Sequence, residues 1–284
     1  MKILACIVLL LFAPFAGATR VVVDEIGRHV EVPDHPHRII CLIPSVADDV
    51  FSLGSGADVV AVSEYTDYPA EAASKPKIGP PMNPSLEKIV ALHPDLILGT
   101  AEMNRTPALE GMSRRGVPIF FVDPHGIAGI YRAISSIGHV LNRDREAANL
   151  VADLHAREQR TRARAQGKVP VRIFLPVWYD PITTIGRRAF ITELIEAAGA
   201  SSITSDIAQE WPQVSLESVV ARHPEALVLI RGSQISPEML SSRPGWAQLP
   251  AIQKHHIYFV DEHIQLPGPS AIHAMEALSK EFYP

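Results

Sequence analysis

Residues 85–98 read SLEKIVALHPDLIL, and residues 215–228 read SLESVVARHPEALV, so one stretch of sequence occurs twice, 130 residues apart and without a gap. A second pair of similar segments supports the repeat, because residues 38–44 read RIICLIP and residues 172–176 read RIFLP. Similarity within one chain at a fixed offset indicates duplicated structural units. The sequence therefore predicts two copies of one unit, each of the size of a lobe.

Each copy has the pattern of an α/β unit. Ser85 can cap a short helix that ends at the His93-Pro94 turn, and an apolar strand follows at residues 96–98. The apolar runs at residues 38–43 and 171–175 are typical of buried parallel strands. Strands that alternate with helices predict parallel sheets with helices on both faces. The expected fold class is α/β, with two similar lobes.

A long helix is expected between the two copies. Residues 142–166 contain neither glycine nor proline and are rich in alanine, leucine, arginine and glutamate. Leu150, Val151 and Leu154 form a narrow apolar stripe, and polar residues cover the rest, as in a helix that bridges two domains. A helix of about 24 residues spans roughly 36 Å. Such a rigid connector leaves a cleft between the lobes, which is the default ligand site.

The N-terminus reads as a secretory signal peptide. A basic start is followed by an apolar run at residues 3–15 and by the small residues of Ala16-Gly17-Ala18, which predicts export to the periplasm and cleavage near Ala18-Thr19. Cys6 lies inside the apolar run, so we interpret it as incidental. Cys41 would then be the sole cysteine, without a disulfide partner. We divide the chain into a signal peptide, an N-terminal lobe, a connecting helix and a C-terminal lobe, at residues 1–18, 19–141, 142–167 and 168–284.

Composition and motifs exclude several classes of protein. The 284 residues are 47% hydrophobic and 20% charged, which is typical of a globular protein, and the net charge of −5 argues against nucleic acid as a partner. Phosphate-binding loops, serine nucleophile elbows and zinc-protease motifs are absent from the sequence, so we predict no catalytic residues. The twelve histidines show no spacing that makes three or four ligands converge, so we predict no metal site. An exported α/β enzyme and a zinc or manganese receptor remain as alternatives.

Aromatic residues cluster in three segments at residues 65–69, 178–181 and 210–213. The first two segments follow strands, and the loops beyond the carboxyl ends of parallel strands bind ligands. Aromatic faces with a few polar neighbours suit a large, flat and partly apolar ligand. The alternative is that these rings merely cover the lobe surfaces.

Glu87 and Glu217 hold equivalent positions in the two repeats. Each follows a serine that can cap a helix, so each can counter the helix dipole as a first-turn acid. Alternatively, the two acids orient a partner that has matching two-fold symmetry.

These residues carry a resemblance to a known family. Residues 38–45, 83–95 and 266–269, with the long helix, resemble the iron-siderophore/cobalamin-type periplasmic binding proteins, the solute receptors of ABC importers. Residues 65–69 and 211–215 are most similar to the cobalamin-binding branch.

The resemblance implies a monomeric receptor without catalysis or a resident cofactor. It would capture a corrinoid, cobalamin, between its lobes and deliver it to an ABC permease in the inner membrane. A ferric siderophore or haem receptor is the alternative within the family. In that family an acid on each lobe pairs with permease arginines, and Glu87 and Glu217 match those positions. The candidate ligand-binding residues are Tyr65, Trp178, Tyr179, Trp211, Asp261 and Glu262, and the arginines that could hold a carboxylate-rich siderophore are Arg187, Arg188 and Arg231.

Overall fold

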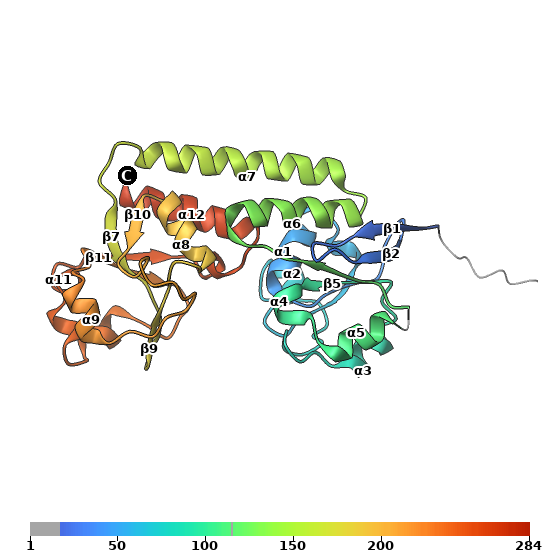
Figure 1. Cartoon of the computed structure of the whole chain (residues 1–284), viewed down its shortest axis with the longest axis horizontal. Helices are drawn as coiled ribbons and strands as arrows, with labels where there is room; N and C mark the ends of the chain where they lie inside the picture. The colour runs from blue at the N-terminus through green and yellow to red at the C-terminus, as the bar shows by residue number, and fades with distance from the viewer. Residues whose placement is uncertain (1–17, 115) are drawn as a thin grey trace, which may run out of the picture.

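The computed structural model describes residues 18–114 and 116–284, and it has two α/β lobes side by side (Figure 1). The predicted fold class is confirmed. The predicted signal peptide lies outside the described residues, except for Ala18.

The N-terminal lobe is built on a four-stranded parallel sheet in the order β4-β3-β5-β6. An antiparallel hairpin, β1-β2, precedes this sheet. The strands are β1 Thr19–Val23, β2 His29–Pro33, β3 Ile39–Cys41, β4 Val59–Val62, β5 Leu96–Thr100 and β6 Ile119–Val122. The helices are α1 Pro44–Ser52, η1 Gly56–Asp58, α2 Ala70–Ala73, α3 Leu86–Ala91, α4 Ala101–Asn104, α5 Pro107–Ser113 and α6 Gly126–Val140.

The C-terminal lobe repeats this plan with a parallel sheet in the order β10-β7-β11-β12. The strands are β7 Val171–Phe174, β8 Pro176–Tyr179, β9 Ile182–Thr184, β10 Ala200–Ser202, β11 Ala226–Ile230 and β12 Ile257–Val260. The helices are α8 Phe190–Ala197, α9 Leu216–Ala221, α10 Pro237–Ser241, η2 Trp246–Gln248, α11 Pro250–Gln253, η3 Glu262–Gln265 and α12 Pro269–Phe282.

The repeated sequence folds identically in both lobes. Ser85 Oγ accepts a hydrogen bond from Lys88 N at 3.3 Å, and Ser215 Oγ accepts one from Ser218 N at 3.2 Å. After each helix the histidine before the proline has a left-handed backbone, with φ of 45° at His93. This conformation ends a helix and turns the chain into the following strand. Strands β5 and β11 belong to different sheets, as the two-lobe prediction requires.

Residues 178 and 179 depart from the sequence-based prediction of a loop. They belong to strand β8, which pairs antiparallel with β9 so that Trp178 lies opposite Thr183. The β-branched residues of β9 favour an extended strand, and the Asp180-Pro181 pair supplies the turn.

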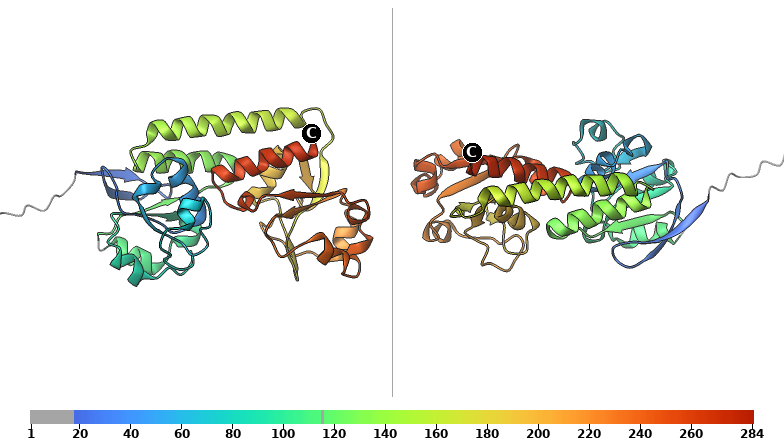
Figure 2. Two further views of the ribbon diagram at one scale, coloured as in Figure 1. Left: turned by 180° about the vertical axis from the view of Figure 1, so that it is seen from behind. Right: turned by 90° about the horizontal axis from the view of Figure 1, so that it is seen from above.

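Helix α7, Asp144–Ala165, connects the lobes and packs along α6 and α12 (Figures 1 and 2). Its buried residues are Ala147, Leu154 and Thr161, which lie seven residues apart on one face. Arg157 bonds both Asp153 at 2.8 Å and Glu276 of α12 at 3.0 Å. Helix α7 therefore packs against both lobes, through α6 of the N-terminal lobe and α12 of the C-terminal lobe.

An apolar core continues from one lobe into the other. It contains Ile39 and Leu98 of the N-terminal sheet and Ile173 and Val228 of the C-terminal sheet, together with residues of α1, α6, α7, α8 and α12. Helix α6 contacts α8, and α1 contacts α12. The lobes are thus joined by packed helices as well as by the connecting helix.

Candidate ligand-binding cleft

A cavity of about 380 Å³ lies between the lobes, and we call it the interlobe cavity. Its N-terminal wall consists of Ile43, Pro44, Ser45, Tyr65, Pro81, Thr100, Glu102, Met103, Asp123, Pro124, His125 and Gly126. Its C-terminal wall consists of Arg188, Phe190, Glu210, Trp211, Gln265, Leu266 and Pro267. Most of these residues follow strands β3, β4, β5 and β6 at their carboxyl ends, which is where parallel sheets bind ligands.

Two of the predicted aromatic residues line the interlobe cavity from opposite sides. Tyr65 belongs to the N-terminal wall and is 64% exposed, and Trp211 belongs to the C-terminal wall and is 42% exposed. Large rings that remain this exposed have apolar faces available for a ligand. Each wall of the interlobe cavity therefore presents one aromatic side chain.

Trp178 and Tyr179 lie outside the residues that line the interlobe cavity. Their rings stack on each other, with 5.4 Å between centroids, and Trp178 Nε1 donates to Asp180 O at 2.8 Å. The Arg243 guanidinium lies 4.5 Å from the Tyr179 ring centroid. These contacts give both rings partners within the C-terminal lobe.

Asp261 and Glu262 stand at the start of η3 and are exposed. Asp261 Oδ1 accepts a hydrogen bond from His263 N at 3.0 Å, so it caps this short helix. The three residues that η3 and its end bring to the interlobe cavity are Gln265, Leu266 and Pro267. The segment that begins at Asp261 therefore reaches the cavity, but Asp261 and Glu262 themselves do not line it.

Charged side chains also line the interlobe cavity, and the sequence does not predict that they lie together. Glu102 and Asp123 come from the N-terminal lobe, and Arg188 and Glu210 come from the C-terminal lobe. Burial, and then the charge of Glu102, raise the pKa of Glu210. The charge of Glu102 on one wall therefore acts on Glu210 on the other. Glu102 comes two residues after strand β5 and Asp123 directly follows strand β6, positions that could have pointed to them.

His125 and Met103 add two possible ligands for a metal that a bound molecule carries. His125 Nε2 lies 3.2 Å from Asp123 Oδ1, and its side chain is 71% exposed. Neutral imidazole and thioether groups both bind transition metals.

The buried side chain of Asn104 stabilises the N-terminal wall of the interlobe cavity near Thr100. Asn104 is fully buried; its Oδ1 accepts from Thr100 N at 2.9 Å and its Nδ2 donates to Pro81 O at 2.8 Å. A Cβ on Gly99 would lie 2.6 Å from Asn104 Oδ1, so glycine is required there. The Asn104 amide thus fixes two segments of the N-terminal wall.

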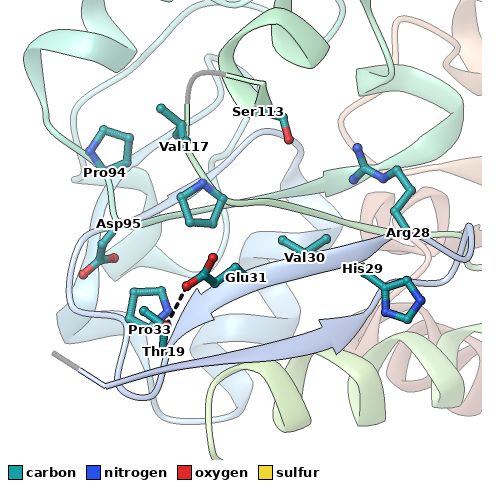
Figure 3. Close-up of a pocket in the computed structure, with 12 residues that line it drawn as sticks. Thr19, Arg28, His29, Val30, Glu31, Pro33, Pro94, Asp95, Ser113 and Val117 are labelled. Carbon is teal, nitrogen blue, oxygen red and sulfur yellow. Dashed lines mark hydrogen bonds between the residues drawn. The ribbon is translucent and has the colours of Figure 1, made fainter. Parts of the chain in front are cut away.

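A larger cavity, of about 630 Å³, lies beside the β1-β2 hairpin at the outer edge of the N-terminal lobe (Figure 3). It runs between β2 and the segments around Pro94 and Val117, and Thr19 Oγ1 donates to Glu31 Oε1 at 2.7 Å across its end. Its described lining contains no phenylalanine, tyrosine or tryptophan side chain and comes from one lobe only. The interlobe cavity is therefore the candidate ligand site.

Within residues 18–114 and 116–284, no group of three or more His, Cys, Asp or Glu side chains is arranged to hold a metal ion. None of the helices in the same two ranges is both long and apolar enough to span a membrane.

Two lobes, a fastened connecting helix and an aromatic cavity between the lobes define a solute-binding receptor. The chain belongs to the periplasmic binding protein family, which it matches over residues 39–264. Members of this family are exported receptors for solutes.

Three relatives illustrate the range within the family. The chain is 28% identical to an ABC transporter substrate-binding lipoprotein of Bacillus subtilis, over 92% of this chain and 84% of the relative. It is 27% identical to the vitamin B12-binding protein of Vibrio parahaemolyticus, over 86% of this chain and 89% of the relative. Among solved structures, the periplasmic heme-binding protein RhuT of Roseiflexus has a TM-score of 0.80 and 25% identity, covering 87% of this chain and 98% of that chain.

Proposed function

We propose that this chain is a periplasmic receptor, without enzymatic activity, that captures a corrinoid in the interlobe cavity and passes it to an ABC importer. The observation that carries the choice of ligand is the charge of the cavity. Glu102, Asp123 and Glu210 supply three carboxyl groups, and Arg188 supplies one guanidinium. Such a cavity disfavours an anionic ligand.

The three ligand classes differ in their peripheral groups. Haem carries two propionates, and many siderophores carry several carboxylates, whereas the corrin ring carries neutral carboxamides. A carboxamide donates hydrogen bonds through its NH₂ group and has no charge to be repelled by Glu102 and Glu210. The relative named as a vitamin B12-binding protein supports the same choice.

Haem is the second candidate, because His125 and Met103 line the cavity and could coordinate iron. The structural similarity to a heme-binding protein also favours it.

Calorimetric titration with cyanocobalamin, haemin and a panel of ferric siderophores tests the proposal directly. We expect the tightest binding for cyanocobalamin. The double variant Glu102→Gln with Glu210→Gln should gain affinity for haemin and leave cyanocobalamin binding nearly unchanged. Glu238→Gln, an exposed acid of α10, is the control. Tighter binding of haemin than of cyanocobalamin by the wild-type protein would establish the haem alternative.

For the partner, we propose that Glu87 and Glu217 contact the two halves of the permease. Both acids are exposed in the first turn of equivalent helices, α3 and α9. These helices lie one on each lobe, on the side away from α7 (Figure 1). A partner with two-fold symmetry could therefore reach both acids at once.

A further inference from the structure

Two helices that begin at the interlobe cavity have no side-chain cap from their own N-cap residue within the described chain. They are α6 and α12, the last helix of each lobe. Helices α3, α5, α9 and α10 differ, since a serine or threonine at each N-cap position accepts a backbone N–H. The first turns of α6 and α12 therefore need another acceptor.

The opposite lobe supplies that acceptor in both cases. Asp48, on α1 of the N-terminal lobe, accepts from Ser270 N at 2.9 Å and from Ser270 Oγ at 2.6 Å. Glu193, on α8 of the C-terminal lobe, accepts from Ile127 N at 2.8 Å. Ser270 and Ile127 are each the second residue of their helix, so the two contacts are equivalent.

The backbone at both contacts suits a close approach by the carboxylate. A Cβ on Gly126 would lie 2.4 Å from Glu193 Oε2, and a Cβ on Gly268 would lie 3.0 Å from Asp48 Oδ2. Asp48 is 2% exposed and Glu193 is half-buried, so water competes little for these bonds. Carboxylates at helix N-termini are also favoured by the helix dipole.

We infer that Asp48 and Glu193 are positioning residues that set the angle between the lobes, and thereby the width of the interlobe cavity. Apolar packing between α6 and α8 and between α1 and α12 holds the lobes together, but such packing has little directional preference. The two carboxylate caps supply direction, because each fixes a helix end of one lobe to a side chain of the other. The two caps lie next to the cavity wall, because that wall includes Gly126 at the start of α6 and Leu266 and Pro267 just before α12.

The distance between the lobes can be measured without a ligand. Val90 and Val220 are exposed at equivalent positions of the two lobes, so Val90→Cys with Val220→Cys places one spin label on each. Cys41 is buried and burial raises the pKa of its thiol, so it does not compete for the label. Cys6, the other cysteine of the chain, is replaced by serine in all of these proteins, and pulsed electron paramagnetic resonance then gives the distribution of label distances.

The parent protein should give one narrow distribution. Asp48→Ala with Glu193→Ala should widen it clearly, and each single variant should widen it less, because the remaining cap still acts. Asp48→Asn with Glu193→Gln keeps the side-chain shape and removes the charge, so it should give an intermediate width. If the alanine pair does not fold, this isosteric pair decides the question.

Asp24→Asn is the matched control, because Asp24 is also buried and accepts several hydrogen bonds, all within the N-terminal lobe. It should lower the melting temperature and leave the distance distribution unchanged. The inference is overturned if a folded cap variant keeps the parent width, or if Asp24→Asn widens the distribution equally.

Discussion

Arg38 and Arg172 make the same contact in the two lobes. Arg38 Nη2 donates to Leu92 O at 2.6 Å, and Arg172 Nη2 donates to Arg222 O at 2.6 Å. Arg38 directly precedes β3, and Arg172 is the second residue of β7. Each arginine donates to the carbonyl at the end of the repeated helix of its lobe. A cation at a helix C-terminus is favoured by the helix dipole. The duplication therefore extends from sequence to individual side-chain contacts.

Removing either arginine should destabilise its own lobe. For Arg38→Ala and for Arg172→Ala we expect a loss of about 1 kcal/mol in the free energy of unfolding, because hydrogen bonds to helix-terminal carbonyls are lost. Urea denaturation followed by circular dichroism measures this loss. Equal stability of both variants and the wild type would show that solvent replaces these bonds.

Trp211→Ala should weaken ligand binding by about 2 kcal/mol or more, because a central aromatic residue of a binding site is removed. Calorimetry measures the affinity, and quenching of tryptophan fluorescence by the bound ligand gives a second readout. Trp178→Ala is the matched control, since Trp178 lies outside the cavity lining and has similar exposure, 45% against 42%. A larger loss of affinity in the control would place the ligand elsewhere.

Charge reversal should separate docking from ligand capture. Glu87→Arg with Glu217→Arg should abolish transport and stimulation of the importer, with ligand affinity near that of the wild type. Glu238→Arg reverses another exposed first-turn acid, which the Ser236 cap precedes, and should transport normally. Normal transport by the double variant would leave Glu87 and Glu217 with a helix-start role only.

Asp49 should make stability depend on pH. It is 1% exposed, and burial, followed by the charge of Asp48, raises the pKa of its carboxyl well above the ordinary value. The folded protein then retains a proton that the unfolded chain loses above about pH 4. This contribution to stability is greatest below that pH and declines as the pH rises toward the raised pKa.

Asp49→Asn cannot lose this proton. Its free energy of unfolding, relative to that of the wild type, should therefore increase from pH 5 to pH 8. Urea titrations of both proteins at the two pH values test this. A constant difference between the two proteins would contradict a protonated Asp49.

Much of the fold could be predicted from the sequence because its determinants are local or repeated. The repeat at residues 85–98 and 215–228 indicated two lobes, and the Ser85 and Ser215 caps act within three residues of their own position. The absence of glycine and proline from residues 142–166 predicted the connecting helix, which needs little more than helix propensity and one apolar stripe.

The candidate site could be predicted only in part. Tyr65 is predicted from its place after a strand and Trp211 from its aromatic segment before the repeated helix, and the structure brings both to the same cavity. Trp178 is predicted by the same argument as Tyr65 and lies in a hairpin instead, where its strand pairs with β9.

The tertiary structure alone decided the charge of the interlobe cavity and the joint between the lobes. Glu102 and Glu210 line the same cavity only because the two lobes face each other, and their positions in the sequence do not indicate that they share a cavity. Asp48 contacts a residue 222 positions away, and Glu193 one 66 positions away. A local pattern specifies which residues form a helix, but the acceptor for that helix's free N–H groups depends on where distant elements pack.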